Sequence, residues 1–569
     1  MQKSILFRSA SIMLIMIMLF SISIDVSAKR IKDNSIYVIH LNGSLVEKKD
    51  KFKFSDMLPA LIGLKPNITI GLNDVLKNIK TAAENPNVKG IYLYGGDLKA
   101  GYASLKEIRN ALISFKNTGK FIVAYADTYS QKNYYLASVA DKIMLNPYGS
   151  VDVKGLSSET TFYKNAIDKL GIEMQVVKVG TYKSAVEPYT NTEMSDANRE
   201  QVKVFLNSIW NNLSTEIAQS RKLSSEKINQ IADNYSALLP TPKLREMNLI
   251  DTLVYIDETD SIVNKFVADK KKPNKIGHYE FTSLNRKSIK DKNKIAIIYA
   301  DGSIATDGAI NSKTVLKLCK ELEANNSVKA VVLRVNSPGG SAFESEKIWR
   351  ALTRLKMKKP VVVSMGNVAA SGGYYISSNA SRIFAQPTTV TGSIGIFGLF
   401  PNMKGINDKL GLSYDGVKTN KLSDAYSTNR AFTDEERMLM QDKINEGYEL
   451  FVKRCAEGRK KTTDEIKAIA EGRVWTGEDA LKIGLVDELG GLNDAIKSAA
   501  ELSEIETYQL VIPTVKSKNN SVSLISVEQK LEENILKNKL GDYYQLFKDM
   551  NEIESQDRIQ ARMLYDVND

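Results

Sequence analysis

Histidine and cysteine are almost absent from this chain. Its 569 residues include two cysteines, Cys319 and Cys455, which lie far apart in predicted helices. These two cysteines form neither a disulfide framework nor a metal-binding motif. The two histidines are His40, inside an apolar strand, and His278. A Ser-His-Asp triad or a histidine-rich metal site therefore has almost no residues to draw on, and we expect no metal and no cofactor.

Aromatic residues are scarce among the basic ones. The net charge of +11 is modest for this length. The densest cluster of basic residues begins at Lys270 and continues from Arg286 to Lys294. It contains few aromatic side chains that could stack on bases. We interpret residues 266–293 as a lysine-rich, solvated connector and expect no nucleic-acid partner.

Long apolar runs are also lacking, except at the amino terminus. There, basic residues precede an apolar run over 12–24, which is short for a bilayer span of about 20 residues. Residues 26–28, Val-Ser-Ala, resemble a small-residue cleavage site. Removal of residues 1–28 as a signal peptide and their retention as a membrane anchor both stay open. In either case we expect the bulk of the chain to lie outside the cytoplasm.

From Ser35 onward, apolar strands alternate with amphipathic helices. Such alternation indicates βαβ units and an α/β fold with mostly parallel sheets. A chain of 569 residues is too long for one core, so we expect two or more domains. The predicted strands begin near 35, 90, 121, 294, 330 and 360, and the predicted helices cover 73–83, 105–115, 134–139, 312–322 and 343–355.

The two halves are copies of one unit. Three matched segments share a constant offset of 240, which indicates a duplication. These are NVKGIYLY (87–94) with SVKAVVLR (327–334), YYLAS (134–138) with YYISS (374–378), and KLGI (169–172) with KLGL (409–412). Each copy continues into a long helical arm, 195–221 and 434–459. We place one domain at 35–265, the other at 294–504, and a carboxyl-terminal tail at 505–569.

The first copy carries an insert. The pair LNGSL (41–45) and ADGSI (300–304) is offset by 259, so the first copy has 19 extra residues around 48–71. The insert contains the apolar run 56–64, which has no counterpart in the second copy. A packed loop and a loop that faces membrane or substrate both stay open.

The copies differ where chemistry would occur. In GNVAASGGYYISS (366–378), Ser371 lies at a small-residue bend from strand to helix, as in nucleophile elbows, although the G-x-S-x-G pattern is not met. A serine that merely caps the helix is the alternative interpretation. At the offset of 240, Ser371 aligns with Gln131, and the pair Gly339 and Gly340 aligns with Lys99 and Ala100. Conversely, Lys183 aligns with Ser423.

Each copy thus keeps half of a candidate site. A serine hydroxyl needs a base, and with histidine scarce a neutral Lys183 is the natural candidate. Burial would have to lower its pKa from about 10.4 toward about 7 to 8; a plain surface lysine is the alternative. Gly339 and Gly340 leave their amides accessible, so with the amide of Gly372 they could form an oxyanion hole. A type II turn is the alternative interpretation of the same glycines.

Four motifs resemble the signal peptide peptidase A family, in its long, duplicated bacterial form also called protease IV. They are VNSPGG (335–340), NVAASGGYY (367–375), TGSIGIFG (391–398) and GTYKSAVEP (180–188). The resemblance implies tandem ClpP/crotonase-like α/β domains and a serine-lysine dyad. It assigns Ser371 as nucleophile, Lys183 as general base, Ser393 as the serine that hydrogen-bonds the lysine, and Gly339, Gly340 and Gly372 as the oxyanion turns.

The same resemblance implies a membrane-associated serine endopeptidase. Its substrates would be released signal peptides and other apolar peptides, and its place the extracytoplasmic side of the bacterial inner membrane. We expect an extended peptide to pair with a strand edge near the SPGG turn, and a homo-oligomer, here a tetramer. Whether the dyad forms within one chain or between chains stays open. The rival hypotheses are a crotonase-like acyl-CoA enzyme and a non-catalytic scaffold; the complementary losses in the two copies argue against the scaffold.

Overall fold

The computed structural model describes residues 30–49, 68–267, 272–285, 290–514 and 559–563. Two features expected from the sequence lie outside these residues. They are the amino-terminal segment 1–28 and most of the insert around 48–71.

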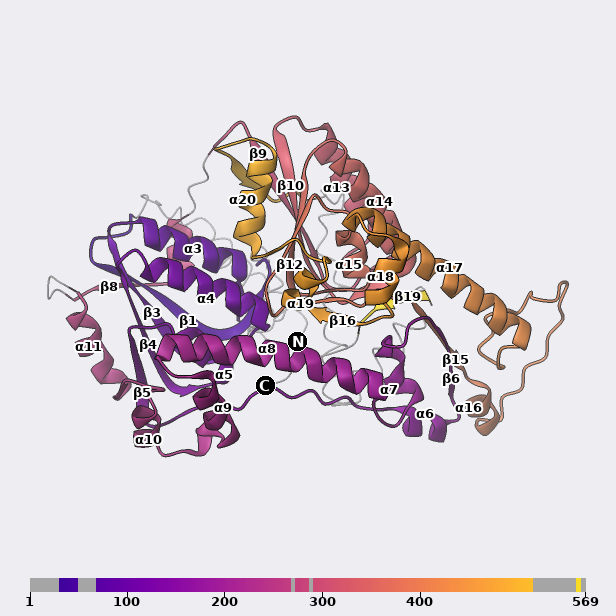
Figure 1. Ribbon diagram of the computed structural model, residues 1–569, viewed down its shortest axis with the longest axis horizontal. Helices are drawn as coiled ribbons and strands as arrows, with labels where there is room; N and C mark the ends of the chain where they lie inside the picture. The colour runs from indigo at the N-terminus through magenta and orange to yellow at the C-terminus, as the bar shows by residue number, and fades with distance from the viewer. Residues whose placement is uncertain (1–29, 50–67, 268–271, 286–289, 515–558, 564–569) are drawn as a thin grey trace, which may run out of the picture.

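The first copy is built on a parallel sheet, drawn in indigo and violet in Figure 1. Its strands run in the order β2-β1-β3-β4-β5-β7, with β8 also paired to β1. They are β1 (Ser35–Val46), β2 (Thr69–Gly71), β3 (Val88–Lys99), β4 (Phe121–Tyr129), β5 (Lys142–Val151), β7 (Thr252–Leu253) and β8 (Asn274–Gly277). In β1, four consecutive apolar residues from Ile36 to Ile39 are all buried. Helices on both faces of a parallel sheet require such continuous apolar runs.

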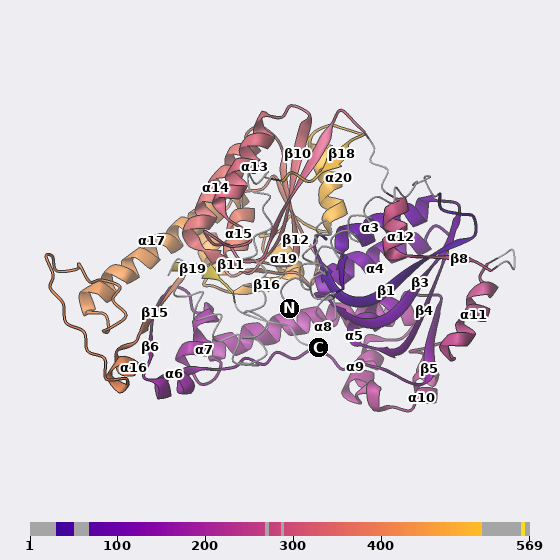
Figure 2. The ribbon, with the colours of Figure 1, turned by 180° about the vertical axis from the view of Figure 1, so that it is seen from behind.

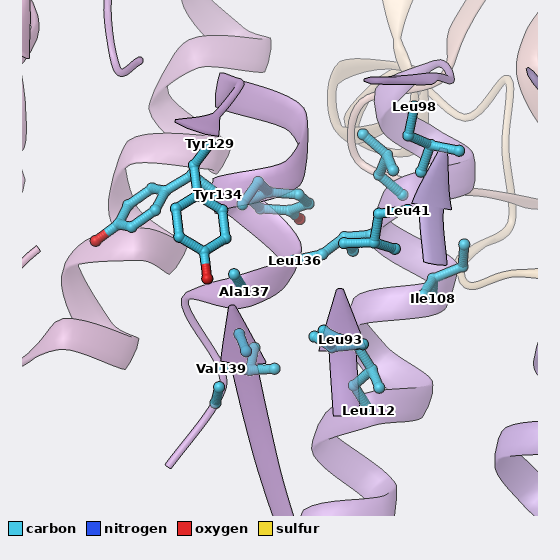
Figure 3. Close-up of a cluster of buried hydrophobic side chains, with 14 of the residues drawn as sticks. Leu41, Leu93, Leu98, Ile108, Leu112, Tyr129, Tyr134, Leu136, Ala137 and Val139 are labelled. Atoms are coloured by element: carbon cyan, nitrogen blue, oxygen red, sulfur yellow. The ribbon is translucent and has the colours of Figure 1, made fainter. Parts of the chain in front are cut away.

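Helices α3 (Leu72–Glu84) and α4 (Tyr102–Lys116) cover one face of this sheet. Figure 3 shows Ile108 and Leu112 of α4 lying against Leu41 and Leu93 of the strands, with Leu136 from the next helix beside them. The remaining helices of the first copy are α5 (Gln131–Ala137), α6 (Lys164–Leu170), α7 (Glu187–Thr190), α8 (Asp196–Arg221), α9 (Ser225–Asp233), α10 (Thr241–Glu246), α11 (Thr259–Lys265) and α12 (His278–Leu284).

The second copy repeats this plan around its own sheet. Its strands run in the order β16-β14-β12-β10-β9-β18, with β13 paired to β12 and β17 paired to β13. They are β9 (Lys294–Asp301), β10 (Val328–Ser337), β12 (Val361–Ala370), β13 (Arg382–Ala385), β14 (Val390–Gly392), β16 (Val474–Thr476), β17 (Glu488–Leu489) and β18 (Gln509–Val511). The helices are α13 (Ser312–Ala324), α14 (Ala342–Lys356), α15 (Gly372–Ser377), α16 (Lys404–Lys409), α17 (Asp434–Arg459), α18 (Thr463–Ile469), α19 (Gly477–Lys482) and α20 (Leu492–Leu502).

The helices confirm the predicted duplication. α3 and α13 are both 13 residues long and begin 240 residues apart, at Leu72 and Ser312. The arms α8 and α17 are both 26 residues long. Each arm begins at a hydroxyl cap, since the side chains of Ser195 and Thr433 accept hydrogen bonds from backbone amides of the first turn.

A third, smaller sheet joins the copies. Its strand order is β11-β19-β15-β6, from β11 (Gly339–Ser341), β19 (Ile559–Arg562), β15 (Phe397–Asn402) and β6 (Glu173–Lys178). β6 comes from the first copy and runs antiparallel to β15 of the second, with Lys178 paired to Phe397. Figures 1 and 2 show this pair side by side, with the long helix α8 of the first copy passing beneath the second. The tail thus contributes strands to two sheets, β18 and β19.

Part of the expected connector belongs to the first domain. β8 pairs with β1, and the buried Phe281 of α12 contacts the ring of Tyr37, so residues 274–284 extend the first core. Cys319 and Cys455 are buried and unbridged in α13 and α17. Within the described ranges, no helix is both long and apolar enough to cross a membrane.

Candidate active site

Ser371 lies at the strained bend between β12 and α15. Its backbone adopts φ 54° and ψ −114°, a conformation that non-glycine residues rarely take and that often marks a functional site. Its amide donates to the Gly392 carbonyl over 2.8 Å, and its carbonyl accepts from the Tyr375 amide of the first helical turn. The predicted strand, turn and helix are therefore present, and the side chain of Ser371 is fully buried.

Lys183 reaches Ser371 within the same chain. Its Nζ lies 2.7 Å from Ser371 Oγ, 3.0 Å from Ser393 Oγ and 3.1 Å from the Ser393 carbonyl oxygen. Lys183 is 1% exposed. Burial lowers the pKa of Lys183 from its ordinary 10.5 to about 7, because desolvation disfavours the ammonium form. The amine is therefore partly neutral at pH 7 and can accept a proton.

The pairing of β6 with β15 explains how a lysine of the first copy arrives here. β6 ends at Lys178, and the chain then turns across the second copy, where the Val179 amide donates to the Ile396 carbonyl over 3.1 Å. Beyond it, the Tyr182 amide donates to the Glu471 carbonyl over 2.8 Å. A backbone held at both points limits where Lys183 can place its amine.

Gln201 and Gly472 hold the lysine loop, and neither was predicted. Gln201 Nε2, from α8, donates to the Tyr182 carbonyl over 3.0 Å and to Ser184 Oγ over 3.1 Å. Gly472 has φ +76°, and a Cβ added there would come within 2.7 Å of Lys183 backbone atoms. Neither residue lies in a motif, and their spacing from Lys183 carries no signal, so sequence reasoning had no means to find them.

The glycine turns pack against the bend. Gly339 and Gly340 have φ of +100° and +150°, which L side chains rarely adopt. A Cβ on Gly340 would come within 2.0 Å of the Ile304 carbonyl oxygen, and one on Gly339 within 2.7 Å of the Gly372 amide nitrogen. The three predicted oxyanion glycines therefore converge next to Ser371, where backbone amides could face a substrate carbonyl.

Family models and relatives agree on what this chain resembles. The model of peptidase family S49 matches residues 114–268 and again 353–506, and that of Clp protease matches 286–390. The chain is 36% identical over 498 residues to Protease 4 of Haemophilus influenzae, covering 82% of this chain and 78% of that protein. It is 38% identical over 455 residues to Protease 4 of Salmonella typhi, covering 77% and 73%. The chain belongs to peptidase family S49.

A chloroplast protein adds to the S49 relatives. Serine protease SPPA, chloroplastic, of Arabidopsis thaliana is 30% identical over 493 residues, covering 84% of this chain and 70% of that protein. The predicted family and the duplicated ClpP-like α/β fold are confirmed, and the chain is a serine peptidase. The catalytic roles assigned to single residues of this chain remain predictions, which the geometry supports. These residues include Ser371 and Lys183.

In the first copy of this S49 chain, the position that corresponds to the candidate active site is filled by a buried glutamine. Gln131 occupies the position of Ser371 and is 1% exposed. Its Oε1 accepts from the amides of Lys154 and Gly155, both at 3.0 Å, and its Nε2 donates to Tyr102 Oη over 3.0 Å. The glutamine thus satisfies backbone donors with no hydroxyl to react. Ser423, the counterpart of Lys183, lies exposed in the loop before α17.

A buried ion triad joins the two S49 copies. Arg334 of β10 donates from Nε to Glu47 over 2.8 Å and from Nη2 to Glu107 over 2.6 Å, and all three side chains are buried. Glu47 follows β1, at the start of the insert, and Glu107 lies on α4. A single arginine within the apolar run 330–335 of β10 was the available signal, because a buried charge requires a partner.

Proposed function

We propose that this S49 peptidase cleaves peptide bonds with Ser371 as nucleophile and Lys183 as general base. The observation that carries the proposal is the 2.7 Å separation between Lys183 Nζ and Ser371 Oγ, with both side chains buried. An acyl-CoA enzyme of the same fold class would leave this pair without a task.

The arrangement supports acyl transfer in two steps. The neutral Lys183 amine takes the proton of Ser371 as Oγ attacks a peptide carbonyl, and the same proton then passes to the leaving amine. Amides at Gly340 and Gly372 would stabilise the oxyanion, a contribution of about 3 to 4 kcal/mol per donor in other enzymes. Water activated by Lys183 then releases the acyl group and regenerates Ser371.

Hydrolysis of a short fluorogenic peptide by purified variants tests this proposal. We expect Ser371→Ala and Lys183→Ala each to lose about 10⁴-fold or more in kcat/KM, because the two groups act as a unit. Lys347→Ala is a matched control, since Lys347 is partly exposed and contacts two neighbours on its own helix, the Glu344 carboxylate and the Phe343 ring. Full activity in either dyad variant would disprove the dyad.

For the substrate class, we propose released signal peptides and other apolar peptides. The resemblance of the four sequence motifs supports it, and the residues that follow Ser393 in sequence, Ile394 and Ile396, are apolar and buried. A series of peptides of equal length that differ in apolar content tests the assignment. Cleavage that does not increase with apolar content would contradict it.

For location, we propose the extracytoplasmic side of the bacterial inner membrane. The amino-terminal pattern of basic residues, an apolar run and Val-Ser-Ala supports export. Mass spectrometry of the mature amino terminus distinguishes removal of 1–28, which would start the chain at Lys29, from retention. Membrane fractionation with protease protection tests the side of the membrane, and protection from added protease in spheroplasts would contradict it.

For assembly, we propose a homotetramer. The arm formed by α16, the following loop and α17 extends away from both domain bodies (Figure 1). It exposes large apolar side chains, among them Leu410 at 68%, Tyr414 at 58% and Met438 at 61%. Exposed apolar side chains that gather into one patch are typical of protein interfaces. Light scattering after size exclusion tests the assembly, and Leu410→Asp should shift it toward monomers.

A further inference from the structure

Arg473 packs on two aromatic rings next to the lysine loop. It directly precedes β16, beside which α8 of the first copy passes (Figure 1). Its guanidinium carbon is 4.8 Å from the centre of the Tyr182 ring and 4.7 Å from that of the Trp475 ring. Tyr182 belongs to the first copy and directly precedes Lys183. Since a cation is attracted to an aromatic face, Arg473 of the second copy binds the lysine loop of the first.

Polar contacts hold the outer end of the same side chain. Arg473 Nη2 donates to Glu200 Oε1 of α8 over 3.1 Å, and Tyr182 Oη donates to Glu200 Oε2 over 3.2 Å. The three side chains thus contact one another, with Glu200 52% exposed and Arg473 23%. An ion pair with so exposed a carboxylate contributes little by itself, so the contact between the guanidinium and the rings should dominate.

The main chain of Arg473 contacts the other side of the candidate active site. Its carbonyl accepts from the Ser393 amide over 2.7 Å, and the preceding amide, of Gly472, donates to the Ile394 carbonyl over 2.9 Å. Ser393 is the residue whose hydroxyl and carbonyl contact the Lys183 amine. Arg473 therefore contacts the lysine loop with its side chain and the Ser393 turn with its backbone.

The Lys183 amine has no acidic partner among the residues that the structure describes. It contacts Ser371 Oγ and the hydroxyl and carbonyl of Ser393. The other ionisable side chains on the segments around the loop are Tyr182, Glu187, Glu200, Tyr448, Glu471 and Arg473. Burial is what lowers the pKa of Lys183, so a loop that opens to water should raise that pKa.

We propose that Arg473 is a positioning residue for the proposed base. By fixing Tyr182 against the loop before β16, it directs the Lys183 amine toward Ser371 and Ser393 and keeps that amine dry. Arg473 acts through the backbone of the lysine loop and is not itself a catalytic residue. This inference rests on the proposed function and deepens it, because it names the contact between the copies on which the base depends.

Steady-state hydrolysis of the fluorogenic peptide by Arg473→Ala, measured from pH 6 to 9, tests the proposal. We expect kcat at pH 7 to fall about 10²-fold while KM changes less than about threefold, because the base is misplaced and the substrate contacts remain. The pH of half-plateau should rise by about one unit, since water around Lys183 favours its ammonium form. An unchanged kcat, or a lower kcat with an unchanged half-plateau pH, would overturn the proposal.

Two further substitutions separate the charge of Arg473 from its volume. Arg473→Lys keeps a cation over the rings but loses the planar fork, so it should recover about tenfold of the lost kcat. Arg473→Met keeps an unbranched side chain without the charge and should resemble Arg473→Ala. Equal kcat in the Lys and Met variants would show that the cation does not hold the loop, and would overturn the proposal.

Arg454 provides a matched control. Its guanidinium carbon lies 4.0 Å from the centre of the Trp349 ring, it pairs with Glu346, and it is 21% exposed. Arg454→Ala therefore removes the same kind of contact at a distance from the lysine loop. We expect its half-plateau pH to stay near 7, the pKa of Lys183. A rise equal to that of Arg473→Ala would show a general loss of packing and would overturn the proposal.

The pKa of Lys183 can also be followed without catalysis. In a Ser371→Ala background, lysine labelled with ¹³C at Cε gives an NMR resonance that disappears when Lys183→Ala is added, and its titration reports the pKa. We expect Arg473→Ala, and likewise Tyr182→Ala, to raise this pKa by about one unit. An unchanged pKa in both would overturn the inference and leave the proposed function intact. Full peptide hydrolysis by Lys183→Ala would instead refute the proposed function.

Discussion

The two copies share a framework and differ in the groups that could react. Both contain a strand, a bend and a short helix at the same place, but the bend carries Gln131 in one and Ser371 in the other. Gln131 uses its amide to satisfy the backbone of Lys154 and Gly155, whereas Ser371 faces Lys183. The first copy is thus a structural partner that brings Lys183, the proposed base, to Ser371 of the second.

One ion pair is present in both copies, but its acidic and basic residues are on opposite helices. In the first copy, Lys106 of α4 pairs with Glu216 of α8, and Tyr135 Oη donates to that glutamate. In the second, Glu346 of α14 pairs with Arg454 of α17, and Tyr375 Oη donates to Glu346 over 2.7 Å. The ion pair thus survives with its signs reversed. The contact between arm and domain is therefore constrained by charge complementarity, and not by which helix carries the cation.

The largest expected effect comes from making the second bend resemble the first. Ser371→Gln should abolish peptide hydrolysis, a loss of about 10⁴-fold or more. The reverse change, Gln131→Ser, should create no second active site, because the counterpart of Lys183 is the exposed Ser423. It should also lower the free energy of unfolding by about 1 to 3 kcal/mol, since the buried amides of Lys154 and Gly155 lose their acceptor.

Peptide hydrolysis and urea denaturation of both bend variants measure these effects. Circular dichroism serves as the control for folding of Ser371→Gln. New hydrolytic activity from Gln131→Ser in a Ser371→Ala background would contradict the prediction that the first copy cannot form an active site.

The second largest effect should follow from removing Arg334, which links the two copies. Arg334→Ala leaves Glu47 and Glu107 buried without a cation, which we expect to lower the free energy of unfolding by about 3 to 5 kcal/mol. Arg382→Ala is the control, because its pair with Glu488 is 35% and 50% exposed and should contribute about 1 kcal/mol or less. Denaturant midpoints compare the two, and equal losses would argue against the triad as a link between the copies.

The glycine turn offers a third contrast. Gly340→Ala should reduce kcat/KM by about 10²-fold to 10³-fold, because the added Cβ would collide with Ile304 and displace an oxyanion amide. At the aligned position of the first copy, Ala100→Gly should leave kcat/KM unchanged. Steady-state kinetics of both variants tests the contrast, and unchanged activity in Gly340→Ala would remove this turn from the site.

The smallest effect is the dependence on pH. Burial lowers the pKa of Lys183 to about 7, and the neutral amine is the form proposed to act as base, so kcat/KM should rise with pH and reach half its plateau near pH 7. One pH unit below this pKa, activity should be about tenfold lower than the plateau. Fluorescence at each pH checks that the protein stays folded. A profile that falls from pH 6 to 8 would contradict a neutral lysine base.

Much of this molecule follows from local sequence pattern. The duplication, the central strands and helices of both copies, and the arm 434–459 were predictable, because apolar periodicity and capping residues act over a few positions. Ser371 and Lys183 were identifiable by comparing the copies. The predicted connector was less accurate, since the pairing of 274–277 with β1 depends on a strand some 240 residues away in sequence.

Only the tertiary structure decided how these parts meet. The pairing of β6 with β15 brings Lys183 to Ser371 across 188 positions, and Gln201 and Glu471 fix the lysine loop from two further segments. The sequence by itself determined which elements form and which residues can react. The placement of Lys183 beside Ser371 depends on contacts between distant segments. The lowered pKa of Lys183 depends on burial. A local sequence pattern encodes neither.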